Sequence, residues 1–179
     1  GNKADALTEN EKHGFEIFTG KGNCSTCHTV GEKSALFTDG NFYVTGVGYQ
    51  TAIGAGARVS KVQLAPGEFI EVKHEDMKSF SAPVLNDIGR FAITLDAKDR
   101  WAYKTPGLRN VELTFPYMHD GSLSTLEDVV EFYDKGGYEH DAERVLHPLG
   151  LTQKEKSDLV AFLKSLTTAE DKAKHSPYR

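Results

Sequence analysis

Cysteine, methionine and tryptophan are scarce in this chain of 179 residues, which contains two, two and one of them respectively. No apolar run approaches the ~20 residues that a membrane-spanning helix needs, so no transmembrane segment is expected. The net charge of −5 argues against binding to nucleic acid or to an acidic membrane surface. What remains is a chain with 39% hydrophobic residues, which suffices for one globular domain with its own core.

Both cysteines stand in the stretch GNCSTCHTV, where Cys24 and Cys27 are three residues apart and His28 follows at once. A redox-active CxxC disulfide is expected inside a βαβ pattern, and no strand leads into this motif. A structural zinc site needs four Cys or His ligands, usually as two pairs. The chain has no second cysteine pair, although its seven histidines keep the zinc alternative open.

The third interpretation of this motif is covalent haem. Two thiols form thioethers with the porphyrin vinyl groups, and the next residue must be histidine so that its imidazole can reach the iron from the same turn. The spacing C-x-x-C-H meets this requirement. The sequence therefore predicts one covalent haem c on Cys24 and Cys27, with His28 as the proximal iron ligand.

Three segments combine a capping box with apolar residues at helical spacing. The boxes are Thr8 with Glu11, Ser124 with Glu127, and Thr152 with Glu155. They predict a helix over about 9 to 19, a second in TLEDVVEFYDKGG that is closed by Gly136, and a third in QKEKSDLVAFLKSL. We interpret the apolar stripes of the last two helices as core packing.

Residues 30 to 99 lack this helical pattern. The stretch LFTDGNFYVTGVG holds a D-G turn between aromatic and β-branched residues, which predicts a small β-hairpin followed by a long loop. Proline and glycine in TPGLRNVELTFPYMHDGSL predict one short helical turn near residues 106 to 110 and otherwise irregular chain. The polar tail, 168 to 179, is expected to fray. The expected fold is mainly α, with a long irregular insertion that carries a small β-hairpin.

Several of these stretches resemble one family. GRF, KTPGLRNV, PYMHDG and the closing helix are similar to the C-terminal haem domain of the bacterial di-haem cytochrome c peroxidase and MauG superfamily, and LFTDGNFYVTGVG resembles the segment after its haem motif. The resemblance covers about residues 8 to 167. It implies a c-type cytochrome fold. The chain departs from the family in carrying one CxxCH motif, whereas a complete family enzyme has two, in two domains.

The sequence offers several candidates for the second axial ligand of the iron. In the peroxidase branch the resemblance implies a methionine just before the aromatic-Lys-x-Pro segment, but the matching position is Ala102, which cannot bind iron. Met77 lies in the charged stretch KHEDMKSF, whereas Met118 lies in the apolar, proline-stiffened TFPYMHDG. A thioether ligand favours ferrous iron and needs a dry pocket, so Met118 is the expected ligand. The rivals are Tyr117, since MauG-type proteins can use a tyrosine oxygen, then His119, another ligand or an open site.

Other polar residues receive secondary roles. We expect His119 and Arg109 to make hydrogen bonds around the haem, for example to a propionate. Trp101 is interpreted as a packing residue, with electron relay as the alternative. Asp120 and Gly121 are expected to form a turn. Solvated positions are predicted for His13, His74, His140, His147 and His175.

These observations lead to two functional hypotheses for a single cytochrome c domain over 1–179, with its core at about 8–167 and a polar tail at 168–179. The first is a single-electron carrier whose one haem is sealed by Met118. The second is a peroxidase or MauG-like oxidase, or a fragment of one, whose second haem domain is absent. The partner is then a redox protein or that second haem domain. Haem c is attached outside the cytoplasm and the chain opens without a signal peptide, so we expect a mature periplasmic or otherwise extracytoplasmic protein.

Overall fold

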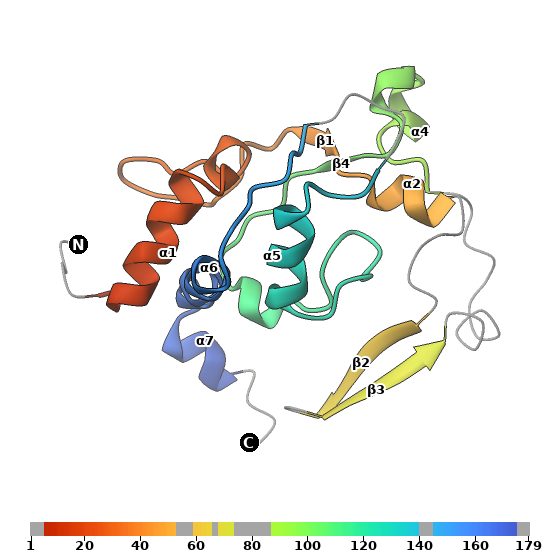
Figure 1. The fold of residues 1–179 in the computed structure, drawn as a ribbon. Coiled ribbons are helices and arrows are strands. Elements are labelled where there is room, and N and C mark those ends of the chain that lie inside the picture. The colour runs from red at the N-terminus through yellow and green to blue at the C-terminus, as the bar shows by residue number, and fades with distance from the viewer. Residues whose placement is uncertain (1–5, 53–58, 66–67, 74–86, 140–144, 175–179) are drawn as a thin grey trace.

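The structure is a computed structural model that describes residues 6–52, 59–65, 68–73, 87–139 and 145–174. The described part is mainly helical, and its strands form small two-stranded antiparallel sheets. Figure 1 shows the helices α1, α5 and α6 gathered on one side, with β1, β4, α2 and α4 on the other. The prediction of a mainly α fold is confirmed.

The helices and strands follow one another in this order along the chain. They are α1 (Glu9–Thr19), the 3-10 helix η1 (Cys24–Thr26), β1 (Phe42–Val44), α2 (Val47–Ala52), β2 (Val59–Ala65), β3 (Glu68–Lys73), α4 (Phe91–Thr94), η2 (Ala97–Asp99), β4 (Ala102–Lys104), η3 (Val111–Leu113), α5 (Leu126–Asp134), α6 (Gln153–Ser165) and α7 (Ala169–Lys174).

Helices α1 and α6 cross at close range, and this contact forms the centre of the core. Gly14 lies at the crossing, where an added Cβ would collide with the backbone carbonyl of Asp158. Only a residue without a side chain lets the two backbones approach this closely. Phe18 and Phe162, one from each helix, are almost fully buried beside the crossing, with 5.2 Å between their ring centroids. Burial of such large aromatic side chains contributes strongly to the stability of a protein core.

Two of the three predicted capping boxes are confirmed. Thr8 and Glu11 cap α1, and Thr152 and Glu155 cap α6. The box predicted for the helix between them, Ser124 with Glu127, is wrong by one residue. Helix α5 is capped instead by Thr125, whose hydroxyl accepts from the N–H of Asp128 at 3.0 Å. This start places Leu126 and Val130, both 3% exposed, against the core. Packing of these side chains therefore decides which of the adjacent residues Ser124 and Thr125 caps the helix.

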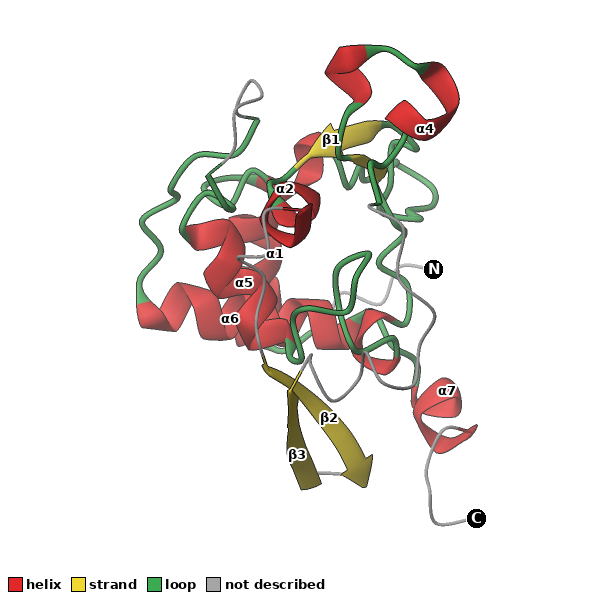
Figure 2. Cartoon of the chain, turned by 90° about the vertical axis from the view of Figure 1, so that its right-hand side faces the viewer, coloured by secondary structure: helices red, strands yellow, loops and turns green. Residues whose placement is uncertain are grey.

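The hairpin predicted at the D-G turn does not form. Gly40 takes a left-handed φ of 71°, but the strand that follows, β1, pairs with β4, about sixty residues later in the sequence. The register joins Phe42 to Lys104, Tyr43 to Tyr103 and Val44 to Ala102. A small antiparallel hairpin is present elsewhere in the insertion, as β2 and β3, which pair from Val59 with Lys73 to Ala65 with Glu68. It stands apart from the helices in Figures 1 and 2.

Two further predictions need correction. The short helical turn expected near 106–110 lies a few residues later, as η3, and begins after Asn110, which takes a φ of 61°. The expected fraying of the tail is wrong for its first part, because α7 occupies Ala169–Lys174. The hydroxyl of Thr168 accepts from the N–H of Asp171 at 3.1 Å and donates to its carboxylate at 2.6 Å, which caps this helix. Of the described helices, none is both long and apolar enough to cross a bilayer.

His13 is exposed, as predicted, and it also makes a hydrogen bond to Asp158. Its Nδ1 lies 2.6 Å from Oδ2 of Asp158, whose side chain is 1% exposed, and Nζ of Lys154 lies 2.7 Å from both carboxylate oxygens. The hydrogen bonds from Lys154 and His13 hold the pKa of Asp158 below its usual value. Helix α1 is thereby tied to α6 by a hydrogen bond as well as by packing. His147 is exposed as expected, and His74, His140 and His175 lie outside the described residues.

Asp158→Asn should destabilise the protein by about 1–3 kcal/mol at neutral pH, because it replaces an ionised acceptor of hydrogen bonds from Lys154 and His13 by a neutral amide. A depressed folded-state pKa contributes stability that is fully present above the unfolded value, near 3.8, and is lost as the pH falls through the folded value. The stability difference between wild type and variant should therefore shrink below about pH 4.

Denaturant unfolding at a series of pH values, followed by circular dichroism, measures this difference. Glu16→Gln, on the exposed side of α1, is the control and should change stability by no more than ~0.5 kcal/mol. A difference between Asp158→Asn and wild type that stayed constant down to pH 2 would contradict the ionic explanation.

Candidate haem site

The CxxCH motif forms one helical turn directly after α1. Gly22 donates its N–H to the carbonyl of Ile17 at 2.8 Å, and a Cβ on Gly22 would collide with that carbonyl. Asn23 then takes a left-handed φ of 52° and starts η1. The N–H of His28 donates to the carbonyl of Cys24 at 2.9 Å, which closes the turn. Residues three and four apart lie on one side of a helical turn, so Cys24 is a neighbour of both Cys27 and His28.

The imidazole of His28 is oriented by a backbone carbonyl. Its Nδ1 donates to the carbonyl oxygen of Phe37 at 2.7 Å. A proton on Nδ1 leaves the lone pair on Nε2, which is the arrangement seen in histidines that bind metals. Burial lowers the pKa of His28, while the carbonyls of Phe37 and Pro106 oppose that shift. The imidazole is therefore neutral, with its proton on Nδ1 and its lone pair on Nε2.

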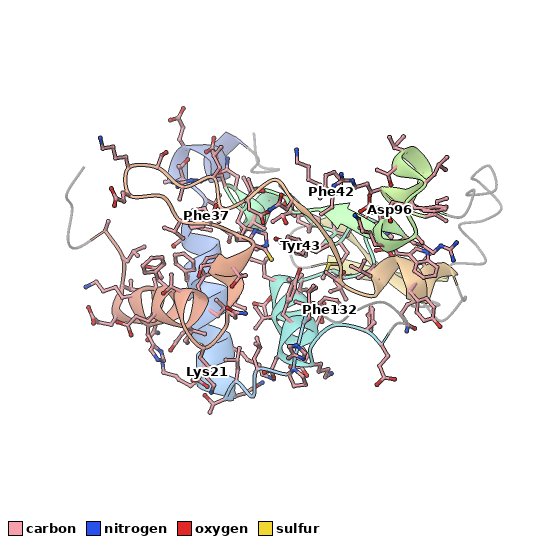
Figure 3. All side chains as sticks on the ribbon, turned by 90° about the horizontal axis from the view of Figure 1, so that it is seen from above. Lys21, Phe37, Phe42, Tyr43, Asp96 and Phe132 are labelled. Carbon is pink, nitrogen blue, oxygen red and sulfur yellow. The ribbon has the colours of Figure 1, made fainter. Side chains whose placement is uncertain are left out.

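Phe37 is itself fixed by the core. Its side chain is 5% exposed and its ring packs edge-on against Phe18 and Phe162, with centroids 5.9 and 6.2 Å away. Its backbone takes a left-handed φ of 56°, which turns the carbonyl toward His28. Figure 3 shows Phe37 next to α1, near the middle of the molecule. The packing of these three aromatic side chains thus positions the Phe37 carbonyl that accepts the hydrogen bond from His28.

Arg109 supports the same loop from outside. Its Nε donates to the carbonyl of Ala35 at 3.0 Å, and its guanidinium lies over the ring of Phe37, 5.4 Å from the centroid. Leu108, the preceding residue, donates its N–H to the carbonyl of Leu36 at 3.2 Å. The structure therefore places Arg109 against the segment that orients His28. Its expected hydrogen bond to a haem propionate remains a prediction.

Both cysteines are free thiols and do not form a disulfide with each other. Burial raises the pKa of Cys24 to about 11 and also raises that of Cys27, so both stay protonated at neutral pH. Cys24 packs against the edge of the hydrophobic core. In the described part of the chain, no three His, Cys, Asp or Glu side chains are grouped so that they could hold a metal ion. Two free thiols and one tautomer-fixed imidazole on one turn match the donor set of covalent haem c.

Trp101 contributes a second observation that fits a bound group. Its indole N–H is buried and finds no acceptor among the described residues. Its ring packs edge-on against Tyr49, with 5.0 Å between centroids, which agrees with the packing role expected from sequence. A buried donor without an acceptor costs about 1–3 kcal/mol. The indole therefore suits a site in which a bound group supplies the acceptor.

Met118 lies in a tight loop between Tyr117 and Leu123. These two residues form an isolated antiparallel bridge, with N–H to carbonyl distances of 2.6 and 3.3 Å. Met118 takes a left-handed φ of 68°, and its carbonyl accepts from the N–H of Gly121 at 3.3 Å. The turn predicted at Asp120 and Gly121 is confirmed. Met118 is partly buried at the start of this turn.

The phenol of Tyr117 is already engaged. Its hydroxyl donates to the carbonyl of Val111 at 3.1 Å, and burial raises its pKa to about 12. Its side chain packs against the same hydrophobic core as Cys24, so the Met118 loop and the CxxCH turn border a common core. A neutral phenol committed to a backbone carbonyl is a poor iron ligand.

His119 and Asp120 anchor the Met118 loop to other segments. The ring of His119 stacks on Tyr103 of β4, with centroids 3.5 Å apart and 13° between planes. Its Nε2 lies 3.9 Å from a carboxylate oxygen of Asp87. Asp120 accepts from the hydroxyl of Thr51 in α2 at 3.0 Å. Burial lowers the pKa of His119, and the nearby carboxylates oppose this shift. These partners were not expected from sequence, because they come from segments far apart along the chain.

The comparisons with known proteins agree with this arrangement. The cytochrome-c peroxidase IdrP2 of Denitromonas iodatirespirans is 38% identical over 165 residues, which cover 90% of this chain and 41% of IdrP2. The methylamine utilization protein MauG of Methylorubrum extorquens is 33% identical over 164 residues, which cover 90% of this chain and 35% of MauG. The chain belongs to the cytochrome c peroxidase and MauG superfamily. No family model matches it.

A solved structure supports the same relationship. The crystal structure of a MauG-like protein associated with microbial copper homeostasis is 30% identical, with a TM-score of 0.63, and the match covers 97% of this chain and 52% of that one. The chain thus has a c-type cytochrome fold of the peroxidase and MauG superfamily. It spans about two fifths of the length of the curated relatives named above.

Replacing either Cys24 or Cys27 by Ala should leave haem that acid acetone extracts at least partly, and replacing both should abolish covalent attachment, because each thioether needs a thiol. His28→Ala should remove the low-spin ferric spectrum. The pyridine haemochrome spectrum before and after extraction measures the attachment. Thr26→Ala, between the two cysteines, is the matched control and should retain covalent haem. Covalent haem in the double cysteine variant would contradict the site.

Proposed function

We propose that this chain is a c-type cytochrome domain that carries one covalent haem and transfers single electrons. The observation that supports this most strongly is the 2.7 Å hydrogen bond from Nδ1 of His28 to Phe37, which prepares Nε2 as an iron ligand on the turn that holds both thiols. When bound, haem c supplies a one-electron couple between ferric and ferrous iron. The chain's own residues attach it, orient its proximal ligand and limit the access of water.

The second part of the proposal is that Met118 binds iron as the sixth ligand. Tyr117 is engaged with Val111, and its raised pKa keeps the phenol neutral. His119 is stacked on Tyr103 and faces Asp87. Both neighbours of Met118 in sequence are therefore held by protein partners. A thioether also tolerates an apolar, partly buried setting better than an oxygen ligand does.

We further propose that the chain corresponds to the C-terminal haem domain of its relatives, in one domain over 1–179 with a core at about 8–167. The partner is then a second haem domain or a separate redox protein. The part-length match to IdrP2 and MauG supports this arrangement. A periplasmic or otherwise extracytoplasmic location is proposed because haem c is attached outside the cytoplasm in bacteria.

A peroxidase or MauG-like oxidase is the second candidate function, and the names of the relatives favour it. Peroxide cleavage needs an open iron position and a nearby group that can exchange protons. His119 and Asp120 are the titratable groups beside Met118, but they serve the iron only if Met118 does not bind it. Both side chains are also bound to other parts of the fold. We therefore favour electron transfer for the chain taken alone.

Met118→Ala should lower the reduction potential, with roughly a tenfold or larger fall in the ferrous-to-ferric ratio at fixed ambient potential, because a soft ligand that stabilises Fe(II) is lost. The ferric spectrum should lose its sulfur-to-iron band and become high-spin or that of a captured ligand. Redox titration followed by optical spectroscopy measures both.

Two controls accompany this variant. Met77→Ala should leave the potential and the spectrum unchanged, since Met77 belongs to a charged stretch of the sequence. Tyr117→Phe should change the spectrum little if sulfur is the ligand, and should erase a phenolate charge-transfer band if oxygen is. An unchanged spectrum in Met118→Ala would refute the thioether and transfer the assignment to Tyr117.

The haem-loaded chain should reduce hydrogen peroxide at a rate near the uncatalysed background, because a six-coordinate iron offers peroxide no position. Stopped-flow mixing of ferrous protein with peroxide, and steady-state turnover with an electron donor, measure this. The Met118→Ala protein is the useful comparison, since opening the site should raise the rate. Peroxidase-level turnover by the unaltered chain would overturn the electron-transfer assignment in favour of the second candidate.

A further inference from the structure

We infer that Asp39 is an electrostatic tuning residue, whose carboxylate lowers the reduction potential of the haem held by Cys24, Cys27 and His28. This inference rests on the haem site proposed above and goes beyond it, because it assigns a function to a residue that neither attaches the haem nor binds the iron. Asp39 follows the histidine-orienting Phe37 by two residues.

The carboxylate of Asp39 is surrounded by hydrogen-bond donors. The hydroxyl of Tyr43 donates to Oδ2 at 2.7 Å, and Nδ2 of Asn41 donates to the same oxygen at 2.9 Å. The backbone N–H of Asn41 donates to Oδ1 at 2.9 Å, and the side chain of Thr105 gives a further hydrogen bond. With the bond from Tyr43 as the largest cause, these donors lower the pKa of Asp39 to about 2. Asp39 therefore carries its negative charge across the physiological pH range.

The backbone places this charge beside the CxxCH turn. The N–H of Asp39 donates to the carbonyl of Cys27 at 2.9 Å, and the hydroxyl of Thr29 donates to the carbonyl of Thr38 at 2.9 Å. Asp39 therefore lies directly against the turn that carries the Cys27 thiol and the His28 imidazole. A charge held beside the proximal ligand acts on any iron bound to that ligand.

The position of the charge is rigid. Tyr43 belongs to β1, which pairs with β4, and the N–H of Thr105 just after β4 donates to the carbonyl of Asn41 at 2.8 Å. The hydroxyl of Thr38 donates to the carbonyl of Thr105 at 2.7 Å. Figure 3 shows Tyr43 on the strand segment that passes near the middle of the molecule. The sheet that the sequence did not predict thus holds the donors of Asp39 in place.

Reduction adds one electron to ferric iron and lowers the positive charge at the haem by one. A fixed negative charge nearby stabilises the more positive ferric state, so it opposes reduction. The carboxylate is only partly buried, so solvent and salt weaken this effect without removing it. Asp39 should accordingly keep the potential below the value that His28 and the sixth ligand would set by themselves.

The test is Asp39→Asn, which keeps the shape of the side chain and removes its charge. The potential should rise, and the ferrous-to-ferric ratio at a fixed ambient potential should increase by roughly threefold to tenfold. Redox titration of the haem-loaded protein, followed optically, measures the shift. Glu32→Gln is the matched control, because it removes the same charge from an exposed side chain in the loop after the haem motif, and its shift should disappear at high salt.

Tyr43→Phe gives an independent test of opposite sign. It keeps the charge of Asp39 and removes the hydroxyl that makes the strongest hydrogen bond to the carboxylate. The unshielded charge should act more strongly on the haem, so the reduction potential should fall below that of the wild type. This sign decides the question if Asp39→Asn does not accumulate as a folded haem protein. A rise in Tyr43→Phe would mean that the hydrogen-bond network, and not the charge, sets the potential, and would overturn the inference.

The outcomes separate this inference from the proposal on which it rests. Covalent haem in all variants with an unchanged potential in Asp39→Asn would overturn the role of Asp39 and leave the haem assignment intact. Absence of covalent haem from the wild-type protein, expressed where haem c is matured, would overturn both. A rise in Asp39→Asn together with a fall in Tyr43→Phe and no lasting shift in Glu32→Gln supports the tuning role.

Discussion

The hydrogen bond from His28 to the carbonyl of Phe37 is the interaction on which the haem site depends. It requires Phe37 to present a carbonyl from a left-handed backbone conformation, which an unsupported phenylalanine seldom adopts. The contacts of its ring with Phe18 and Phe162 compensate for this strain. The crossing of α1 and α6 therefore fixes the orientation of the His28 imidazole through Phe37. Loosening the aromatic cluster would change that orientation and would also destabilise the protein.

The same crossing explains why a charged side chain lies in the core. Asp158 is closed off from solvent where Gly14 brings the two helices together, so it needs hydrogen-bond donors, and His13 and Lys154 reach it from the partly exposed rim. The hydrogen bond from His13 of α1 to this buried carboxylate of α6 aligns the two helices in one register, which apolar contacts alone would allow to slip. Since η1 follows α1 directly, this alignment also positions the CxxCH turn.

The features that could be predicted from the sequence are those set by residues close together along the chain. The CxxCH turn and the caps of α1 and α6 depend on residues within four positions of one another, and these were predictable. The pairing of β1 with β4 joins residues about sixty apart, so the D-G turn suggested a hairpin that does not form. The cap of α5 was missed by one residue because burial of Leu126, and not the capping residue, selects the start. Asp39 could have been noticed beside the haem motif, but its donors come from the unpredicted sheet.

The anchoring of the Met118 loop bears on the choice between electron transfer and peroxide chemistry. An electron carrier benefits when its ligands hardly move between oxidation states, whereas peroxide cleavage requires a ligand to leave or to be absent. The loop is closed by the bridge between Tyr117 and Leu123 and tied to three distant segments through Thr51, Tyr103 and Asp87. These contacts hold the backbone on both sides of Met118 in place. Such anchoring suits the proposed electron transfer better than chemistry that requires a ligand to leave.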